Sequence, residues 1–105
     1  MTPEAKVKAR VVAVLKKHDA YYFFPATHGY GRSGVPDIVC CVEGNFLAIE
    51  CKAGKGKTTA LQEFEIEKIR KAKGTALVVN EDNVGAVSEF IRLITTATED
   101  KHAGA

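Results

Sequence analysis

The sequence predicts a mixed α/β fold, a β-sheet flanked by helices, with the elements in the order α-β-β-β-α-β-α. Apolar residues recur at helical spacing in three segments, near the start, in the middle and near the end of the chain. Short runs rich in β-branched and aromatic residues, bounded by glycine-containing turns, fill the intervals. The middle helix separates two strands, which predicts that these two strands run parallel.

The composition is that of a soluble globular protein. The chain has 105 residues, of which 46% are hydrophobic and 27% are charged, so we expect a single domain with one hydrophobic core. No apolar run approaches the roughly 20 residues of a membrane span, and no signal segment opens the chain. We therefore expect an intracellular, cytoplasmic protein without a membrane partner. The net charge of +2 is too small to establish a nucleic-acid partner.

The three cysteines, Cys40, Cys41 and Cys51, are an odd number without a paired C-x-x-C spacing. This pattern favours small buried hydrophobes over metal ligands or disulfides.

The first segment predicts a helix followed by an aromatic strand. Thr2 is a suitable N-cap, and Pro3 occupies the first helical position, where its missing N–H does no harm. Residues 21–24 (Tyr-Tyr-Phe-Phe) read as a strand ended by Pro25. Because side chains alternate along a strand, we expect half of these rings in the core and the other half available for a dimer contact.

A hairpin comes next, formed by residues 37–42 and 46–52. A tight turn at Gly44 and Asn45 sets Asp37 opposite Lys52, and directly paired residues share a face of the sheet. Asp37, Glu50 and Lys52 then lie on one surface. The opposite surface is wholly apolar and consists of Ile38, Cys40, Val42, Leu47, Ile49 and Cys51.

The second half predicts a helix, a strand and a helix. Thr59 and Gln62 form a capping box that opens the middle helix, and Gly74 is suited to the C′ position after it. Residues 75–80 read as a buried strand, and Asp82 or Asn83 caps the last helix. The core is expected over residues 2–94, with a frayed, flexible tail over 95–105. The apolar stripe of the middle helix is predicted from Leu61, Phe64, Ile69 and Ala72.

Asp37, Glu50 and Lys52 have the chemistry of a hydrolytic metal site. Uncatalysed phosphodiester cleavage is extremely slow, and a divalent cation accelerates it by polarising the phosphoryl oxygen and acidifying a water. Mg²⁺ prefers hard oxygen ligands, which Asp37, Glu50 and the main-chain carbonyl of Cys51 can supply. Lys52 can orient the attacking water or stabilise the charged transition state.

Each piece of this trio also has a simpler interpretation. An Asp after Pro is often only a turn former, and a Glu-x-Lys strand is often a solvated, salt-bridging face. Both pieces on one predicted face, opposite an apolar face and beside the basic loop at residues 53–57, favour the metal site.

The chain also resembles a known family. The features that carry the resemblance are residues 33–37 (Ser-Gly-Val-Pro-Asp), residues 48–52 (Ala-Ile-Glu-Cys-Lys), the lysine/glycine loop, Gln62, and Gly74 before residues 76–79 (Ala-Leu-Val-Val). Together they resemble the PD-(D/E)XK nucleases, whose fold is restriction-endonuclease-like, and more narrowly the virus-type replication–repair nuclease (VRR-NUC) branch. The resemblance covers roughly residues 2–94 and implies a bacterial or phage-type context.

The resemblance implies a Mg²⁺- or Mn²⁺-dependent DNA endonuclease, and small stand-alone members resemble junction resolvases and tend to be homodimers. Asp37 and Glu50 match the metal carboxylates, and Lys52 matches the catalytic lysine. Gln62 matches a glutamine that lines the site. Glu4 matches an acidic residue of the first helix that contributes to metal binding, although an acid in a first turn also simply complements the helix dipole.

Polar and basic residues near the trio are candidate DNA contacts. Lys55 and Lys57 lie on the loop after Lys52 and can follow a sugar–phosphate backbone; ordinary surface lysines are the alternative. His28, Arg32 and Ser33 precede the Pro-Asp step, where a loop without DNA contact is the alternative.

We therefore expect a metal-dependent endonuclease that hydrolyses phosphodiesters in branched DNA of the Holliday-junction type. Paired incisions across a junction need two sites, which favours a symmetric homodimer. The first alternative is a nuclease-fold module that binds DNA structure but is inactive or partner-dependent. The second is an interaction domain with an incidental Glu-x-Lys.

Overall fold

The computed structural model describes residues 1–26 and 32–103, with side chains described as far as residue 98. Its elements follow the predicted order α-β-β-β-α-β-α. They are α1 (Pro3–Lys17), β1 (Tyr21–Phe23), β2 (Ile38–Val42), β3 (Asn45–Cys51), α2 (Ala60–Lys71), β4 (Thr75–Val79) and α3 (Gly85–Ala103).

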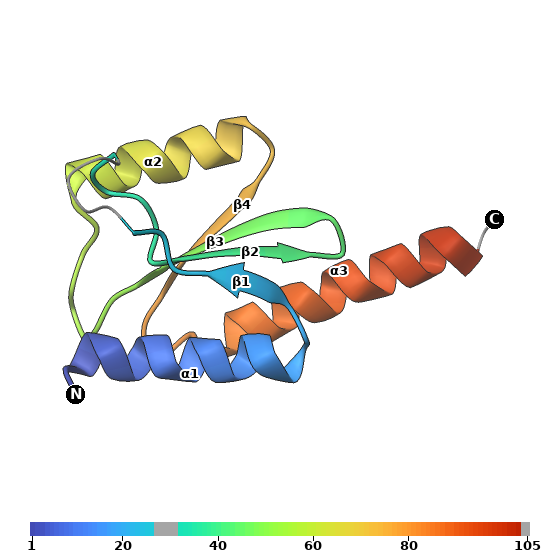
Figure 1. Ribbon diagram of the computed structural model, residues 1–105, viewed down its shortest axis with the longest axis horizontal. Helices are drawn as coiled ribbons and strands as arrows, with labels where there is room; N and C mark the ends of the chain where they lie inside the picture. The colour runs from blue at the N-terminus through green and yellow to red at the C-terminus, as the bar shows by residue number, and fades with distance from the viewer. Residues whose placement is uncertain (27–31, 104–105) are drawn as a thin grey trace.

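The four strands form one mixed sheet in the order β1-β2-β3-β4. The pairs β1–β2 and β2–β3 are antiparallel, and β3–β4 is parallel. The parallel pair confirms the prediction for the strands on either side of α2. The sheet is the middle of three layers, with α2 on one face and α1 and α3 on the other (Figure 1).

The hairpin turn differs from the predicted one. Glu43 and Gly44 occupy the turn with φ of 50° and 78°, as a two-residue turn with two positive φ angles requires. Asn45 begins β3 instead, and its side-chain amide donates to the carbonyls of Val42 and Glu43. The prediction of a turn at Gly44 and Asn45 was wrong because Glu43, a non-glycine residue, takes the first positive-φ position.

The displaced turn shifts the β2–β3 register by two residues. Ile38 pairs with Ile49, so continuing the ladder backwards sets Asp37 opposite Glu50 and not opposite Lys52 as predicted. A shift of two residues leaves every side chain on its predicted face, because the side-chain period of a strand is two.

The apolar face predicted for the hairpin is the main core of the molecule. All six of its residues are at most 6% exposed, and they pack against apolar residues of α1 and α3. Two of the three cysteines, Cys40 and Cys51, are buried here as predicted, whereas Cys41 points to the other face and is exposed.

The α2 helix buries a different stripe from the one predicted. Leu61 and Phe64 are 57% and 60% exposed, whereas Glu65 and Ile66 are buried. The predicted stripe followed apolar residues only, and the helix is rotated so that an acidic residue faces the sheet. The capping box at its start is confirmed, because Thr59 and Gln62 exchange both side-chain bonds.

The end of α2 also differs from the prediction. Lys73 has a φ of 73° and takes the left-handed position that we assigned to Gly74. Gly74 instead allows the side chains of Ile69 and Phe46 to pack closely on the backbone. An added Cβ would lie 2.9 Å from Cγ2 of Ile69 and 3.0 Å from Cδ1 of Phe46.

The last helix begins at Gly85 and continues to Ala103, through the residues where we expected a frayed tail from Thr95. The side chain of Asn83 bonds to the backbone of Asn80 and Val78 in the turn before α3. Among the described residues, no helix combines the length and apolar character needed to cross a bilayer.

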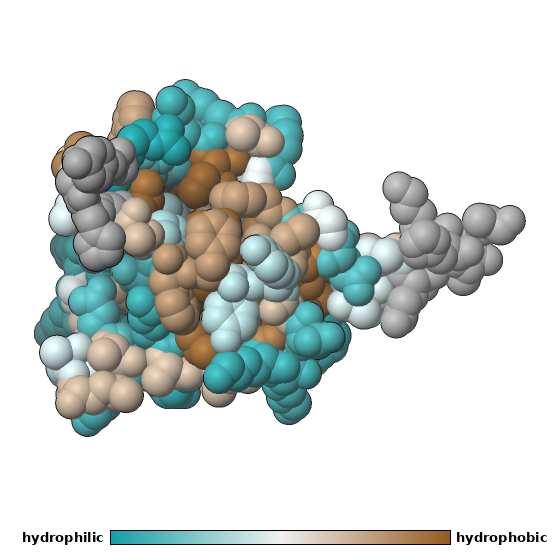
Figure 2. Space-filling model, in the orientation of Figure 1, coloured by the Kyte–Doolittle hydropathy of each residue, from teal (hydrophilic) through white to brown (hydrophobic). Residues whose placement is uncertain are grey.

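β1 is an edge strand with much exposed aromatic surface. Tyr22 packs against the core, whereas Tyr21 and Phe23 are 71% and 48% exposed. The prediction that half of the four aromatic side chains lie in the core was wrong, because Phe24 follows the end of β1 and is 47% exposed, which leaves Tyr22 alone packed against the core. Seen from the side of β1, the surface between α1 and α2 is largely apolar (Figure 2).

Candidate metal and nuclease site

Three carboxylates from distant parts of the chain meet at one end of the sheet. Glu4 belongs to the first turn of α1, Asp37 precedes β2, and Glu50 lies near the end of β3. One ligand oxygen from each residue lies within 4.8 Å of the others. The two strand-associated acids converge as predicted, and Glu4 of the first helix joins them.

The backbone of Cys51 supports Asp37. The Cys51 N–H donates to Oδ2 of Asp37 at 2.9 Å, and the Lys52 N–H donates to the Val79 carbonyl on β4 at 2.9 Å. Because the N–H and C=O of one strand residue point to the same edge and successive residues alternate, the Cys51 carbonyl points to the edge where Asp37 lies. The Cys51 thiol lies in the apolar core on the opposite face of the sheet, where burial raises its pKa to about 12, so the carbonyl is the atom of this residue that can face the cluster.

Glu50 is the most buried member of the cluster, with only 2% of its surface exposed. Its Oε2 accepts a hydrogen bond from Nε2 of Gln62 at 3.0 Å and lies 3.4 Å from Nζ of Lys52. Its Oε1 is also buried and has no hydrogen-bond partner among the described residues. An orphaned buried carboxylate oxygen is costly unless it binds a cation or a donor, and this atom therefore fits a metal ion.

The environment of Glu50 disfavours its charge. Burial and, second, the negative charge of Asp37 raise the pKa of Glu50 from 4.5 to about 7, against the opposing effect of Lys52. Carboxylates crowded into one partly dry site repel each other until a cation neutralises them. The donor set of hard oxygens and this excess negative charge both suit Mg²⁺ or Mn²⁺.

Gln62 joins the start of α2 to the site. Its Oε1 accepts the N–H of Thr59 in the capping box, while its Nε2 donates to Glu50. The Gln62 side-chain amide is therefore hydrogen-bonded at both its oxygen and its nitrogen, and the first turn of α2 orients the Glu50 carboxylate on β3. The sequence resemblance pointed to Gln62, and the capping box predicted its place in the first turn.

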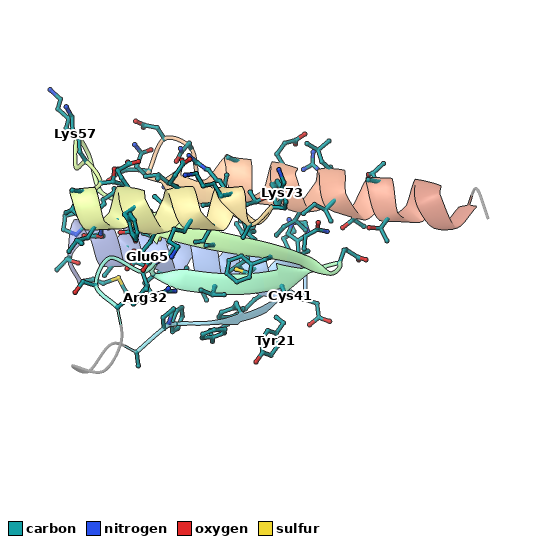
Figure 3. All side chains as sticks on the ribbon, turned by 90° about the horizontal axis from the view of Figure 1, so that it is seen from above. Tyr21, Arg32, Cys41, Lys57, Glu65 and Lys73 are labelled. Carbon is teal, nitrogen blue, oxygen red and sulfur yellow. The ribbon has the colours of Figure 1, made fainter. Side chains whose placement is uncertain are left out.

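The basic loop after Lys52 lies beside the cluster and is exposed. Lys55 and Lys57 are both exposed, and the labelled Lys57 points away from the sheet (Figure 3). The Gly54 N–H donates to Oε1 of Glu81 at 2.7 Å, and Arg10 donates to the Glu81 carbonyl at 3.3 Å. Glu81, which the sequence did not single out, thus ties this loop to α1 and to the turn before α3.

The loop before Asp37 is held against α2. Gly34 has a φ of 81°, and a Cβ there would lie 2.6 Å from the Leu61 carbonyl carbon. Nε of Arg32 lies 3.1 Å from Oε1 of Glu65, and Ser33 is exposed. His28 lies outside the described residues. Glu65 was missed, although its position three residues after Gln62 places it on the same helix face.

A sheet with helices on both faces, an Asp before one strand and a Glu-x-Lys on the next are the features of the PD-(D/E)XK type of nuclease. The fold is similar to that of a solved VRR_NUC domain, with a TM-score of 0.70 and 22% sequence identity over 88% of this chain and 97% of that chain. The chain belongs to the archaeal Holliday junction resolvase (Hjc) family, whose family model matches residues 10–84. None of the curated proteins matches the chain.

Proposed function

We propose that this protein is a Mg²⁺- or Mn²⁺-dependent endonuclease that hydrolyses phosphodiester bonds in branched DNA. The observation that carries the proposal is the cluster of Glu4, Asp37 and Glu50, in which the buried Oε1 of Glu50 has no partner among the described residues. Membership of a family described as Holliday junction resolvases supports a four-way junction as the substrate.

The proposed ligands are one oxygen from each strand-associated acid, the Cys51 carbonyl and, from α1, Glu4. Asp37 and Glu50 each use one oxygen for a hydrogen bond, to the Cys51 amide and to Gln62 respectively. Those bonds orient Oδ1 of Asp37 and Oε1 of Glu50 as the oxygens for the ion. When bound, the ion would polarise the scissile phosphate and lower the pKa of a water.

Lys52 supplies a positive charge at the proposed site in addition to that of the metal ion. Its Nζ lies 3.4 Å from Glu50 and its side chain is only 14% exposed, so little water screens it. From that position its ammonium can donate to the attacking water or to a phosphoryl oxygen as negative charge develops. Lys55, Lys57 and Ser33 are the proposed contacts to the sugar–phosphate backbone, because they are exposed and lie three to five residues along the chain from Lys52 or Asp37.

A panel of labelled DNAs tests the substrate class. Single-stranded, duplex, flap, splayed and four-way DNAs are incubated with the protein in EDTA, Mg²⁺ or Mn²⁺. We expect metal-dependent cutting, strongest on the four-way junction. Binding of the junction in EDTA without cutting in either metal would favour the inactive or partner-dependent binding module instead.

Asp37→Ala tests the site itself. Loss of a residue that only hydrogen-bonds to a metal ligand commonly lowers metal affinity or activity about 10–100-fold. Loss of a ligand itself should therefore reduce cleavage by at least about 100-fold. The variant should remain folded by denaturant unfolding, because relief of the repulsion between the carboxylates offsets the hydrogen bond that the Cys51 N–H loses. Glu67→Ala, which removes an exposed acid of α2, is the matched control and should cut normally; normal cutting by Asp37→Ala would remove Asp37 from the mechanism.

We further propose that the active form is a homodimer. Two incisions across a junction need two sites, and the edge strand β1 presents Tyr21 and Phe23 to solvent, the kind of surface that monomers avoid. Sedimentation should show a dimer that Tyr21→Ser combined with Phe23→Ser converts to a monomer. Leu93→Ser, at a 60% exposed position on α3, is the control; a monomeric wild type contradicts the proposal.

A further inference from the structure

The loop that carries Asp37 is attached to α2 at two points. At Gly34 the backbone packs so closely on the first turn of α2 that an added Cβ would come within 2.8 Å of the Gln62 nitrogen. Two residues earlier, Nε of Arg32 forms a 3.1 Å ion pair with Oε1 of Glu65. The chain between these contacts and Asp37 is short, so their geometry limits where Asp37 can lie.

The Arg32–Glu65 pair is asymmetric. The Glu65 side chain is 6% exposed beneath α2, whereas the Arg32 side chain is 72% exposed. A buried carboxylate is unfavourable without a charged partner, and Arg32 supplies that partner while its guanidinium stays largely hydrated. The pair lies at a groove of about 380 Å³ between α2 and the hairpin, which is also lined by Phe46, Lys68 and Gly74. In the view of Figure 3, Arg32 and Glu65 lie next to each other at the lower edge of α2.

The same face of α2 holds the second carboxylate of the site. Gln62, one turn before Glu65, donates to Oε2 of Glu50 at 3.0 Å. One helix face therefore reaches Glu50 directly through Gln62, and it reaches the loop of Asp37 through Glu65 and Arg32. A movement of the loop relative to α2 would change the separation of the two carboxylates.

We propose that Arg32 and Glu65 are a positioning pair that sets Asp37 at metal-binding distance from Glu50, and that Arg32 is not primarily a DNA contact. The inference rests on the proposed metal site. Removal of either partner should loosen the loop and weaken metal binding. The arginine charge would then matter through Glu65, whereas a phosphate contact would act independently of it.

The test compares Arg32→Ala, Glu65→Gln and the double variant with the wild type. Mn²⁺ affinity is measured by calorimetry at a fixed pH, and affinity for a four-way junction is measured in EDTA over a range of salt. We expect each single variant to raise the Mn²⁺ dissociation constant about tenfold, as outer-sphere changes at metal sites do. The double variant should be no worse than either single variant, because both remove the same contact.

The matched control is the exposed ion pair on α3. Nη1 of Arg92 lies 3.1 Å from Glu89, and both side chains are more than half exposed. Arg92→Ala and Glu89→Gln remove a pair of the same length on α3, a helix that contributes no residue to the cluster, and should leave Mn²⁺ affinity unchanged. Arg32→Lys keeps the charge but loses the planar guanidinium fork, and its exposed position makes it a variant that should fold normally.

The outcomes separate the two roles of Arg32. Unchanged Mn²⁺ affinity in Glu65→Gln, together with weaker junction binding and a smaller salt dependence in Arg32→Ala, would overturn the proposal and make Arg32 a phosphate contact. A wild type that binds Mn²⁺ but cuts no DNA would contradict the endonuclease proposal. The Mn²⁺ affinities of the variants would still decide whether Arg32 and Glu65 are a positioning pair. A wild type that binds no Mn²⁺ overturns both.

Discussion

The two faces of the sheet differ in what they bury. Among the described residues, the face under α1 and α3 buries only apolar side chains, among them Leu47 and Ile49 at 0% exposure. The face under α2 buries two acids, Glu50 and Glu65. Hydrophobic burial stabilises the fold on the first face, whereas the second face keeps charges that are unfavourable until each has a partner. The apolar face therefore supports the fold, and the acidic face contributes Glu50 to the proposed metal site.

The largest expected effect is on the apolar face. Leu47→Ala removes a fully buried side chain and should lower the free energy of unfolding by about 3 kcal/mol, through lost transfer energy and a cavity. Leu93→Ala, at a 60% exposed position, should change it by less than about 0.5 kcal/mol. Denaturant unfolding measures both; similar losses for the two variants would show that the apolar face is not the main source of stability.

The second effect concerns the glycine that packs on α2. Gly34 and Gly44 both have positive φ, 81° and 78°. A Cβ added at Gly34 would collide with the backbone of α2, whereas a Cβ added at Gly44 would have no atom within 4 Å. Gly44→Ala should cost about 1 kcal/mol for the left-handed backbone alone. Gly34→Ala should cost a further 1–3 kcal/mol or so for the collision.

Cleavage sharpens the comparison of these glycines. Because the Gly34 loop carries Asp37, Gly34→Ala should also reduce metal-dependent cutting, while Gly44→Ala should leave it unchanged. Equal effects of the two substitutions on both stability and cutting would mean that the loop does not depend on its contact with α2.

The third effect is a pH dependence from Glu50. Because its pKa is raised from 4.5 to about 7 in the folded protein, the folded state binds more protons than the unfolded state between these values. The stability that Glu50 contributes is thus fully present below pH 4.5 and is lost as the pH rises through 7. For metal-free protein in EDTA, this group should lower the free energy of unfolding by about 1 kcal/mol between pH 6 and pH 8.

Glu50→Gln is the control for this group, because it removes this carboxyl and replaces no other ionisable side chain. The variant should lack that loss between pH 6 and pH 8 and should be more stable than the wild type at pH 8. Equal pH profiles for the two proteins would show that the pKa of Glu50 is not raised. Added Mn²⁺ should abolish the difference by favouring the charged carboxylate.

The smallest effect concerns the N-caps of α1 and α2, which lie on opposite faces of the sheet and should not differ. Thr2 caps α1 and Thr59 caps α2, each by accepting one backbone N–H, at 3.1 Å and 3.2 Å. Thr2→Ala and Thr59→Ala should each lower the free energy of unfolding by about 1 kcal/mol, because capping is a local interaction. Losses that differ by much more than this would mean that the layers differ in helix stability as well as in burial.

Local signals predicted much of the fold. Thr2, Pro3 and the capping box of Thr59 and Gln62 start their helices where expected, because cap chemistry depends on residues only three apart. Asp37 and Glu50 converge although the turn was placed one residue too late. The error moved the register by an even number and so preserved the faces.

The errors share a physical origin. Glu43 and Lys73 adopt positive φ without being glycine, which local preference alone disfavours. Leu61 and Phe64 are exposed while Glu65 is buried, since the rotation of α2 depends on contacts with β4 and with the loop before Asp37. Helical spacing shows which residues share a face but not which face meets the sheet.

The sequence by itself determined the order of the elements and which side chains share a strand face, because backbone periods of 2 and 3.6 residues are local properties. Only the tertiary structure decided what covers each face, and hence the burial of Glu50 and the pairing of Arg32 with Glu65. Burial and charge pairing depend on residues that are distant along the chain, and their positions exist only after the three layers have packed.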